Sequence, residues 1–279
     1  MQISRVDSYD RLEGIPSEFW ESLPVVRGKK VFIKPNLVTP LTGWDLASTT
    51  DVNVVKALIE KLQDLGCCDI SVGDCGFKDQ WDATIKSTRY RILPKMYGIK
   101  LIGLQEGPNF HKFTLQRCSH QYLSLFGVKI SDYVLESDIW IDVPKMKVHK
   151  MALMTGAIKN MMGTMAQKGS MHPKGESSIL HKRLCDLYFL MKDKIGFIVM
   201  DGIVGSEFAE QNGVPVQSNV MLSGTDPWEI DVAASKLMGV NPSRVKYLEY
   251  IRHFNGRSFE EISVPEDLIK EYELPLGWR

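Results

Sequence analysis

The sequence has no excess of either charge. Its 34 Lys and Arg residues balance 34 Asp and Glu residues over 279 positions, so the formal net charge at pH 7 is zero. A general nucleic-acid-binding protein usually carries a basic balance, so we expect no nucleic-acid partner. No apolar run reaches the roughly 20 residues that span a bilayer. The opening stretch MQISRVDSYDRLEG also lacks the apolar core of a signal peptide. We therefore expect no membrane partner.

Cysteines are few, and their spacing does not match a metal site. The chain has five, an odd number, and contains no Cys-x-x-Cys. This usage is typical of a reduced, cytoplasmic compartment. We expect no iron–sulfur cluster and no structural zinc from this chain alone, and we assign no metal ligands. The five residues are Cys67, Cys68, Cys75, Cys118 and Cys185.

Several common catalytic motifs are also absent. The sequence contains no Gly-x-Gly-x-x-Gly, no Walker loop, no Gly-x-Ser-x-Gly and no His-Glu-x-x-His. Nucleotide hydrolysis, serine hydrolysis and zincin chemistry are therefore disfavoured.

What the sequence does contain, near its start, is a pattern typical of a βαβ unit. KKVFIKPNLV is apolar, rich in β-branched residues and closed by Pro35, as in a buried strand. TTDVNVVKALIEKLQDLG follows, with apolar residues at helical spacing, a Thr or Asp cap at its start and Gly66 at its end. CDISVGDCG is typical of a second strand. A strand, a helix and a strand at this spacing predict parallel pairing.

The fold class that we predict is α/β, with a mixed, largely parallel central sheet flanked by helices. Strands near residues 31–35, 70–74, 137–143 and 196–201 should share that sheet. We expect residues 1–279 to form a single α/β domain. Its core should span about 30–240, and 241–279 should be a helical C-terminal extension.

The remaining segments are assigned more simply. IKLIGL predicts a short strand, and ATIKSTRYRILPKMYG predicts a helix that breaks at Pro94. SSILHKRLCDLYFLMKDK predicts another helix, and Asp226-Pro227 should open a third. Residues 151–165 have helical spacing, interrupted by Gly156 and Gly163.

The stretch KMKVHKMALMTGAIKNMMGT, residues 145–164, gathers positive charge on an apolar background. It holds four lysines, one histidine and five methionines, and no acidic residue. In open α/β sheets, ligands bind beyond the carboxyl ends of strands. A phosphate or carboxylate would explain such a cluster at a strand end. The alternative is a solvated basic face with the methionines in the core.

Two residues of this stretch are the leading catalytic candidates. His149 is an acid–base candidate, because an imidazole titrates near physiological pH and nearby lysines would keep it neutral. Its alternative is a hydrogen-bonded core histidine. Lys159 lies in mostly apolar sequence, where an isolated buried charge is costly. We expect it to bind an anion, with a Schiff-base role as the lesser alternative. His172, in the polar loop GSMHPKGES, is either a third catalytic residue or a surface histidine.

Strand ends supply the expected substrate-binding residues. Lys145 and Lys147 should leave a strand with their side chains on the same side, and Lys34 should approach from a neighbouring strand. Asp74 and Asp201 each end a strand, where they would orient His149, hold a metal or cap the next element. The full set is Lys34, Asn36, Asp74, Lys145, Lys147, Asn160 and Asp201.

The motifs, taken in order, resemble the family called domain of unknown function 362. The resemblance covers roughly residues 30–240 and rests on IKPNLV, STTD, VGDCG, VPKMKVHKMALMTGAIKNMMG, MH, VMDGIVG and LSGTDPWEID. Several members carry an added ferredoxin-like iron–sulfur domain. This chain lacks those cysteines, so the resemblance implies no cluster here.

A shorter likeness is to the nickel-pincer lactate racemases. In that family a His is followed by a Gly-rich stretch, a Lys ten positions after the His, and a Gly. His149, Gly156, Lys159 and Gly163 have the same arrangement. The resemblance implies an acid–base role for His149 and a cofactor-holding role for Lys159. The family's metal-binding His corresponds loosely to His172, but the spacing differs by a few residues. The nickel cofactor is therefore not carried over.

These features predict an enzyme that performs proton transfer or redox chemistry on a small anionic substrate or cofactor, in a cleft rich in Lys and His. The alternative is a module that binds a ligand or a redox partner protein without catalysis of its own. The identity of any cofactor is unknown at this stage.

Overall fold

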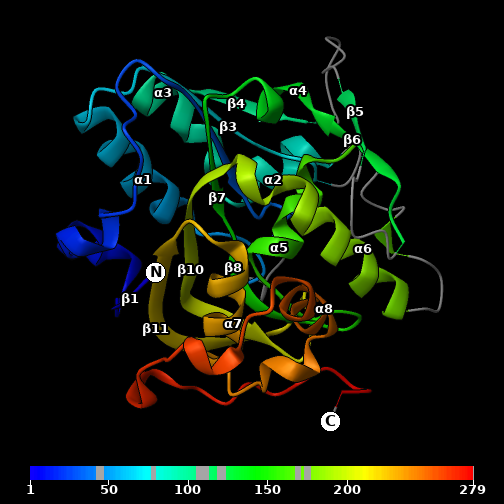
Figure 1. Cartoon of the computed structure of the whole chain (residues 1–279). Helices are drawn as coiled ribbons and strands as arrows, with labels where there is room; N and C mark the ends of the chain where they lie inside the picture. The colour runs from blue at the N-terminus through cyan, green and yellow to red at the C-terminus, as the bar shows by residue number, and fades with distance from the viewer. Residues whose placement is uncertain are drawn as a thin grey trace.

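The computed structural model describes residues 1–41, 47–76, 80–104, 113–117, 124–166, 171–172 and 177–278. The main sheet has the strand order β1-β11-β10-β7-β2-β3-β4, with β8 paired to β10 and β9 paired to β8 (Figure 1). β5 and β6 form a separate two-stranded sheet. The strands are β1 Gln2–Arg5, β2 Lys30–Pro35, β3 Asp69–Asp74, β4 Lys100–Gly103, β5 Phe113–Arg117, β6 Gly127–Ser131, β7 Ile139–Val143, β8 Lys145–His149, β9 Leu153–Thr155, β10 Ile195–Glu207 and β11 Val214–Gly224. The α-helices are α1 Val52–Asp64, α2 Trp81–Ser87, α3 Leu93–Tyr97, α4 Asp132–Leu135, α5 Ala157–Asn160, α6 Ser177–Met191, α7 Pro227–Leu237 and α8 Lys246–Asn255.

The central part of the sheet is parallel, as the sequence predicts. β2 pairs in parallel with β3 and with β7, β3 pairs with β4, and β10 pairs with β7 and β8. The antiparallel pairs are β10–β11 and β11–β1, at one end of the sheet, and β8–β9, which form a hairpin. The predicted α/β class with a mixed, largely parallel sheet is confirmed, and the four predicted strands share this sheet.

Side chains of the central strands alternate between two apolar layers. On β2, Val31 and Ile33 face one layer and Phe32 faces the other, and on β7 Trp140 lies on the same side as Phe32. This period of two follows from strand geometry. α1 lies on one side of the sheet, and α5, α6 and α8 lie on the other (Figure 1). Helices cover both faces, so the charged side chains on the central strands must be buried wherever they do not reach an edge.

Two helices begin where the sequence predicts, and the first also ends as predicted. Asp51 caps α1 by accepting a hydrogen bond from the Asn53 N–H at 2.8 Å, and Gly66 beyond the helix has a φ of +84°. Asp226 accepts from the Trp228 N–H at 2.8 Å, with Pro227 in the first turn of α7.

Two local predictions are corrected. The break expected at Pro94 comes earlier, at Arg89, which has a φ of +65°, and Pro94 opens α3. The first helical turn tolerates proline because its N–H would be unpaired anyway. Residues 145–149 do not leave a strand; they form β8 itself, which turns back into β9 before α5 begins. Nearly all residues of 151–165 are buried, so apolar residues occur at helical spacing there although the segment is not one continuous helix.

The C-terminal residues 241–278 pack on the main core. Phe259, Ile262, Leu268 and Tyr272 belong to the same apolar cluster as α6 and α7. The Lys270 N–H also donates to the Leu237 carbonyl at 2.8 Å. Among the described helices, none has both the length and the apolar character needed to cross a membrane. Cys118 lies outside the described residues, and no disulfide joins any of Cys67, Cys68, Cys75 and Cys185 to one another.

Candidate functional site

Charged side chains at the carboxyl ends of β2 and β7, and on β8 and β10 beside them, are almost fully buried. Lys34 on β2 lies in register with Asp142 on β7, and Lys145 on β8 lies in register with Asp201 on β10. All four side chains are 1% exposed or less. Residues paired in register on adjacent strands are close neighbours. The strand order therefore places each lysine beside a carboxyl group that lies far away in the sequence.

Lys34 is the centre of one buried network. Its Nζ lies 3.0 Å from Asp74 Oδ1 and donates to Asn160 Oδ1 at 2.6 Å. The Asn160 amide donates in turn to Asp142 Oδ1 at 2.8 Å. Asn160 therefore bridges a cation and a carboxyl group, and it holds the end of α5 against the ends of β2 and β7.

Gly163 closes over this network. A Cβ atom at this position would lie 2.0 Å from Asp74 Oδ1 and 2.5 Å from Lys34 Nζ. The Gly163 carbonyl accepts from the Cys75 N–H at 2.8 Å. Only glycine leaves room for the Lys34–Asp74 ion pair beneath the backbone.

Lys147 joins the same network through Asn36. Its Nζ donates to Asn36 Oδ1 at 3.1 Å and to the carbonyl oxygens of Ser48 and Glu210. The Asn36 amide donates to Asn160 Oδ1 at 2.9 Å. Five of the predicted substrate-binding residues thus form one hydrogen-bonded cluster: Lys34, Asn36, Asp74, Lys147 and Asn160.

Lys145 and Asp201 form a second buried cluster. Lys145 Nζ lies 2.8 Å from Asp201 Oδ2 and 2.8 Å from the Tyr9 hydroxyl, which donates to Asp201 Oδ1 at 2.9 Å. The Asp51 N–H donates to the same carboxylate at 2.9 Å. Burial, and then the charges of Asp201 and Asp51, raise the pKa of Tyr9 far above its usual value, so Tyr9 stays a neutral hydroxyl. This cluster ties the N-terminal segment and the start of α1 to β8.

His149 has a defined protonation state. Its Nδ1 accepts hydrogen bonds from the Met151 and Ala152 N–H groups, both at 3.1 Å. An acceptor nitrogen cannot carry a proton, so the neutral ring has its proton on Nε2. Burial lowers the pKa of His149 well below its usual value, and the positive charges of Lys159 and other neighbours lower it further. His149 is therefore a neutral Nε2–H donor.

His172 and Glu210 lie beside His149. The His149 and His172 rings are stacked, with centroids 5.8 Å apart and planes at 28°. Glu210 Oε1 lies 3.9 Å from His149 Nε2 and 3.7 Å from Lys150 Nζ. Lys159 is half-buried, and its charge is the largest electrostatic cause of the lowered His149 pKa. The three predicted catalytic residues, His149, Lys159 and His172, are thus brought together.

Asp231 fixes the segment that carries Lys159. Its carboxylate accepts from the Ala157 N–H at 2.6 Å and from the Ile158 N–H at 3.1 Å, at the start of α5. A Cβ atom at Gly156 would lie 2.1 Å from Asp231 Oδ1, so glycine is required there too. Burial raises the pKa of Asp231 to about 7, against an opposing effect of these two hydrogen bonds.

Sequence reasoning missed four polar residues of this region. Asp142 is fully buried, and burial raises its pKa well above the usual value, against the opposing effects of the Lys34 charge and the Asn160 hydrogen bond. Tyr9, Glu210 and Asp231 reach the site from an N-terminal turn, a hairpin loop and α7. The motifs WIDVP and DPWEID each place an acid among apolar residues, which is the signal that could have found Asp142 and Asp231.

The expected convergence of Lys34, Lys145, Lys147, His149 and Lys159 on an anion stays a prediction. Lys34 and Lys145 each have a carboxylate partner within the chain. Their charges are therefore balanced without an added ligand.

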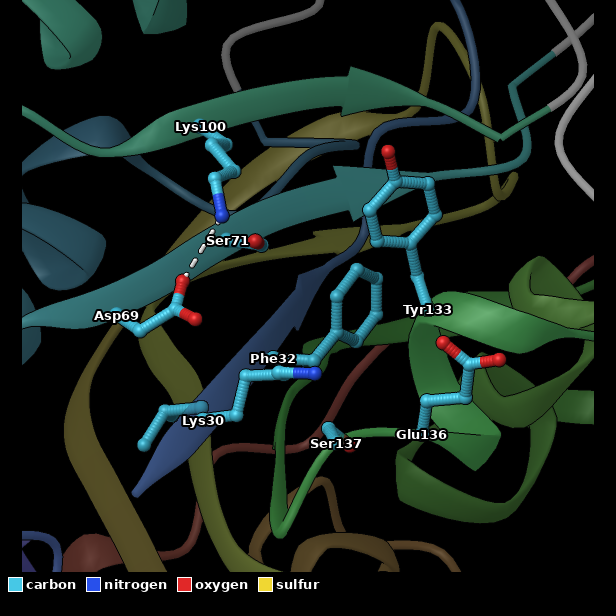
Figure 2. Close-up of a pocket in the computed structure, with 9 residues that line it drawn as sticks. Lys30, Phe32, Asp69, Ser71, Lys100, Tyr133, Glu136 and Ser137 are labelled. Carbon is cyan, nitrogen blue, oxygen red and sulfur yellow. Dashed lines mark hydrogen bonds and ion pairs between the residues drawn. The ribbon is translucent and has the colours of Figure 1, made fainter. Parts of the chain in front are cut away.

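The side chains of this site do not form a set of metal ligands. Within the described ranges, no three His, Cys, Asp or Glu side chains lie close enough together to hold a metal ion. His149 Nδ1 is also occupied by backbone N–H groups. A hollow lies at the opposite edge of the sheet, at the start of β2, β3 and β4, and none of the candidate residues line it (Figure 2).

Comparison with solved structures relates this fold to a racemase. The lactate racemase apoprotein from Thermoanaerobacterium thermosaccharolyticum superposes with a TM-score of 0.55 at 10% identity, over 85% of this chain and 57% of that one. A crystal structure of a protein from Thermotoga maritima gives a TM-score of 0.44 at 14% identity, over 76% of this chain and 55% of that one. The chain thus spans little more than half the length of either protein. At these identities the likeness to the racemase shows the fold.

Sequence comparison gives the family. No curated protein matches the chain. The model of the family described as "Domain of unknown function (DUF362)" matches residues 31–236, which reach from β2 into α7 and include every site residue predicted from the sequence. The chain belongs to this family, as its motifs indicate.

Proposed function

We propose that the chain is an enzyme that moves a proton on a small anionic substrate at the carboxyl edge of the sheet. The observation that carries this proposal is the stacked pair of His149 and His172 beside Lys159. Two imidazoles and an ammonium group supply a donor, a proton acceptor and an anion anchor at one place.

The roles of the two histidines differ. His149 is neutral with its proton on Nε2, so it donates a hydrogen bond to the substrate and does not act as the base in its resting state. His172 is the side chain that accepts the proton. Lys159 binds the carboxylate or phosphate of the substrate, and Asp231 positions Lys159 through the start of α5.

The first substrates to test are 2-hydroxy acids, because the similar racemase acts on a member of this class, lactate. The protein, purified with any small molecules that it retains, should be incubated with each lactate enantiomer and with larger 2-hydroxy acids in D2O. Proton NMR then follows the loss of the hydrogen on the carbon next to the carboxylate. We expect exchange with the wild-type protein and its loss in His172→Asn.

The matched control is His253→Asn, which changes a histidine on α8, remote in sequence from the site. Binding of these acids without exchange, in every preparation, would favour the alternative of a binding module without catalysis. Equal exchange rates in wild type and His172→Asn would refute the role of His172. Mass spectrometry of the native protein identifies any cofactor needed for a redox version of this chemistry.

A further inference from the structure

A second set of polar side chains lines a hollow at the amino edge of the sheet (Figure 2). Phe32, Ser71 and Lys100 are register neighbours on β2, β3 and β4, so they form one row across one face. Tyr133 on α4 and Glu136 just beyond it face this row. The cavity volume is about 120 Å³, close to the roughly 150 Å³ of an engineered cavity that holds benzene. The hollow therefore has room for a small molecule.

The charges around the hollow are balanced but only half of them are paired. Lys100 Nζ lies 3.0 Å from Asp69 Oδ1 on one wall (Figure 2). The Lys30 ammonium group and the Glu136 carboxylate also line the hollow. Neither has an ion-pair or hydrogen-bond partner for its charged group within the part of the chain that the structure describes. Two cations and two anions give no net charge, so the lining favours neither a simple anion nor a simple cation.

Ser71 adds a polar group to the lining. Its side chain lines the hollow and is only 7% exposed. Figure 2 shows its hydroxyl oxygen beside Lys100, on the side of the hollow where Tyr133 lies. Among the described residues this hydroxyl has no hydrogen-bond partner, so it can donate to or accept from a ligand in the hollow.

The rings of Phe32 and Tyr133 give the hollow an apolar side (Figure 2). Phe32 is 1% exposed and belongs to the core, whereas Tyr133 is 38% exposed. A ligand with an apolar group would cover Tyr133 and gain the free energy of removing its ring from water. The lining thus combines a separated cation and anion, a hydroxyl group and an aromatic surface.

We propose that this hollow binds a small zwitterion, namely an α-amino acid with a short apolar side chain. The ligand carboxylate pairs with Lys30, its ammonium group pairs with Glu136, and Ser71 hydrogen-bonds the same polar end. The apolar side chain lies against Phe32 and Tyr133. The site is distinct from the one at the carboxyl edge, because the two share no residue and lie at opposite ends of the parallel strands.

Isothermal titration of the whole chain with L-valine tests the proposal, with two analogues that each lack one charge. Isovalerate lacks the ammonium group and isobutylamine lacks the carboxylate. We expect valine to bind at least tenfold more tightly than either analogue. Lys30→Met and Glu136→Gln should each weaken valine binding about tenfold. These two side chains are exposed, so neither change should disturb folding.

Three further variants complete the test. Ser71→Ala should also weaken valine binding, with circular dichroism to check that the fold is intact. Lys270→Met and Glu271→Gln, two exposed residues that do not line the hollow, should bind valine as the wild type does. Equal affinity for isovalerate and valine would overturn the zwitterion assignment. So would wild-type affinity in Lys30→Met and Glu136→Gln, or the absence of binding by valine, alanine and leucine alike.

Discussion

Replacing Gly163 by alanine tests how strongly the buried charges depend on the backbone that covers them. The added Cβ would lie 2.0 Å from Asp74 Oδ1 and 2.5 Å from Lys34 Nζ, well inside van der Waals contact. Both side chains are 2% exposed or less, so neither can move into solvent. The methyl group can be accommodated only if the ion pair separates. Breaking a buried ion pair costs about 3–5 kcal/mol, because a charge is left without its partner.

Equilibrium unfolding in urea measures this effect. We expect Gly163→Ala to lower the free energy of unfolding by about 3–5 kcal/mol. Gly14→Ala is the matched control, because no atom lies within 4 Å of a Cβ at that position. Its effect should stay within about 1 kcal/mol of wild type. A loss below about 1 kcal/mol in Gly163→Ala, relative to this control, would refute the reasoning.

A double substitution separates the ion pair from general crowding. In a Lys34→Met background the pair is already absent, and a flexible apolar side chain takes the place of the ammonium group. Adding Gly163→Ala there should cost clearly less than it costs in the wild type, since only strain remains. Equal costs in the two backgrounds would mean that the methyl group acts by crowding alone.

Three further predictions concern protonation and ligand binding. Asp231 has a pKa of about 7 in the folded state against 3.8 when unperturbed, so the folded state holds its proton more tightly and stability falls as pH rises from about 4 to 7. The free energy of unfolding should fall by about 4 kcal/mol in total over this range. Urea unfolding at several pH values should show this fall in the wild type and not in Asp231→Asn. Identical pH profiles of the two proteins would contradict the prediction. Nitrogen-15 NMR of labelled histidine should show His149 neutral, with its proton on Nε2, at pH 5.5, and a protonated ring there would disprove the assignment. Phosphate at about ten times its dissociation constant should add about 1.4 kcal/mol to the unfolding free energy of the wild type and of the control Lys270→Met. It should add nothing to the unfolding free energy of Lys159→Met. Full stabilisation of Lys159→Met by phosphate would rule out Lys159 as the anchor.

Local patterns were sufficient to predict the central strands and the capped helices. β2, β3 and β7 are short apolar segments bounded by Pro, Gly or Asp, and the burial that they predict is observed. β10 was predicted too short, because it continues beyond Asp201 to Glu207 along β8 and β11. Lysines in apolar strands were interpreted as anion ligands, and the structure gives Lys34 and Lys145 carboxylate partners within the chain. The partners of those lysines could not be predicted, because pairing depends on the strand order β10-β7-β2-β3, which is not the chain order. Asp142 lies beside Lys34 only because β7 crosses back to β2.

The Lys34–Asp142 register pair also bears on how the chain selects its fold. Shifting β7 by one residue against β2 would place Ile141 or Val143 opposite Lys34. It would also turn Asp142 toward the apolar layer that contains Ile33 and α1. A shifted sheet would then bury a lysine and a carboxyl group apart from each other, among hydrocarbon side chains. The same side chains that form the candidate site therefore exclude alternative strand alignments, and mutations there should produce misaligned or aggregating chains as well as inactive ones.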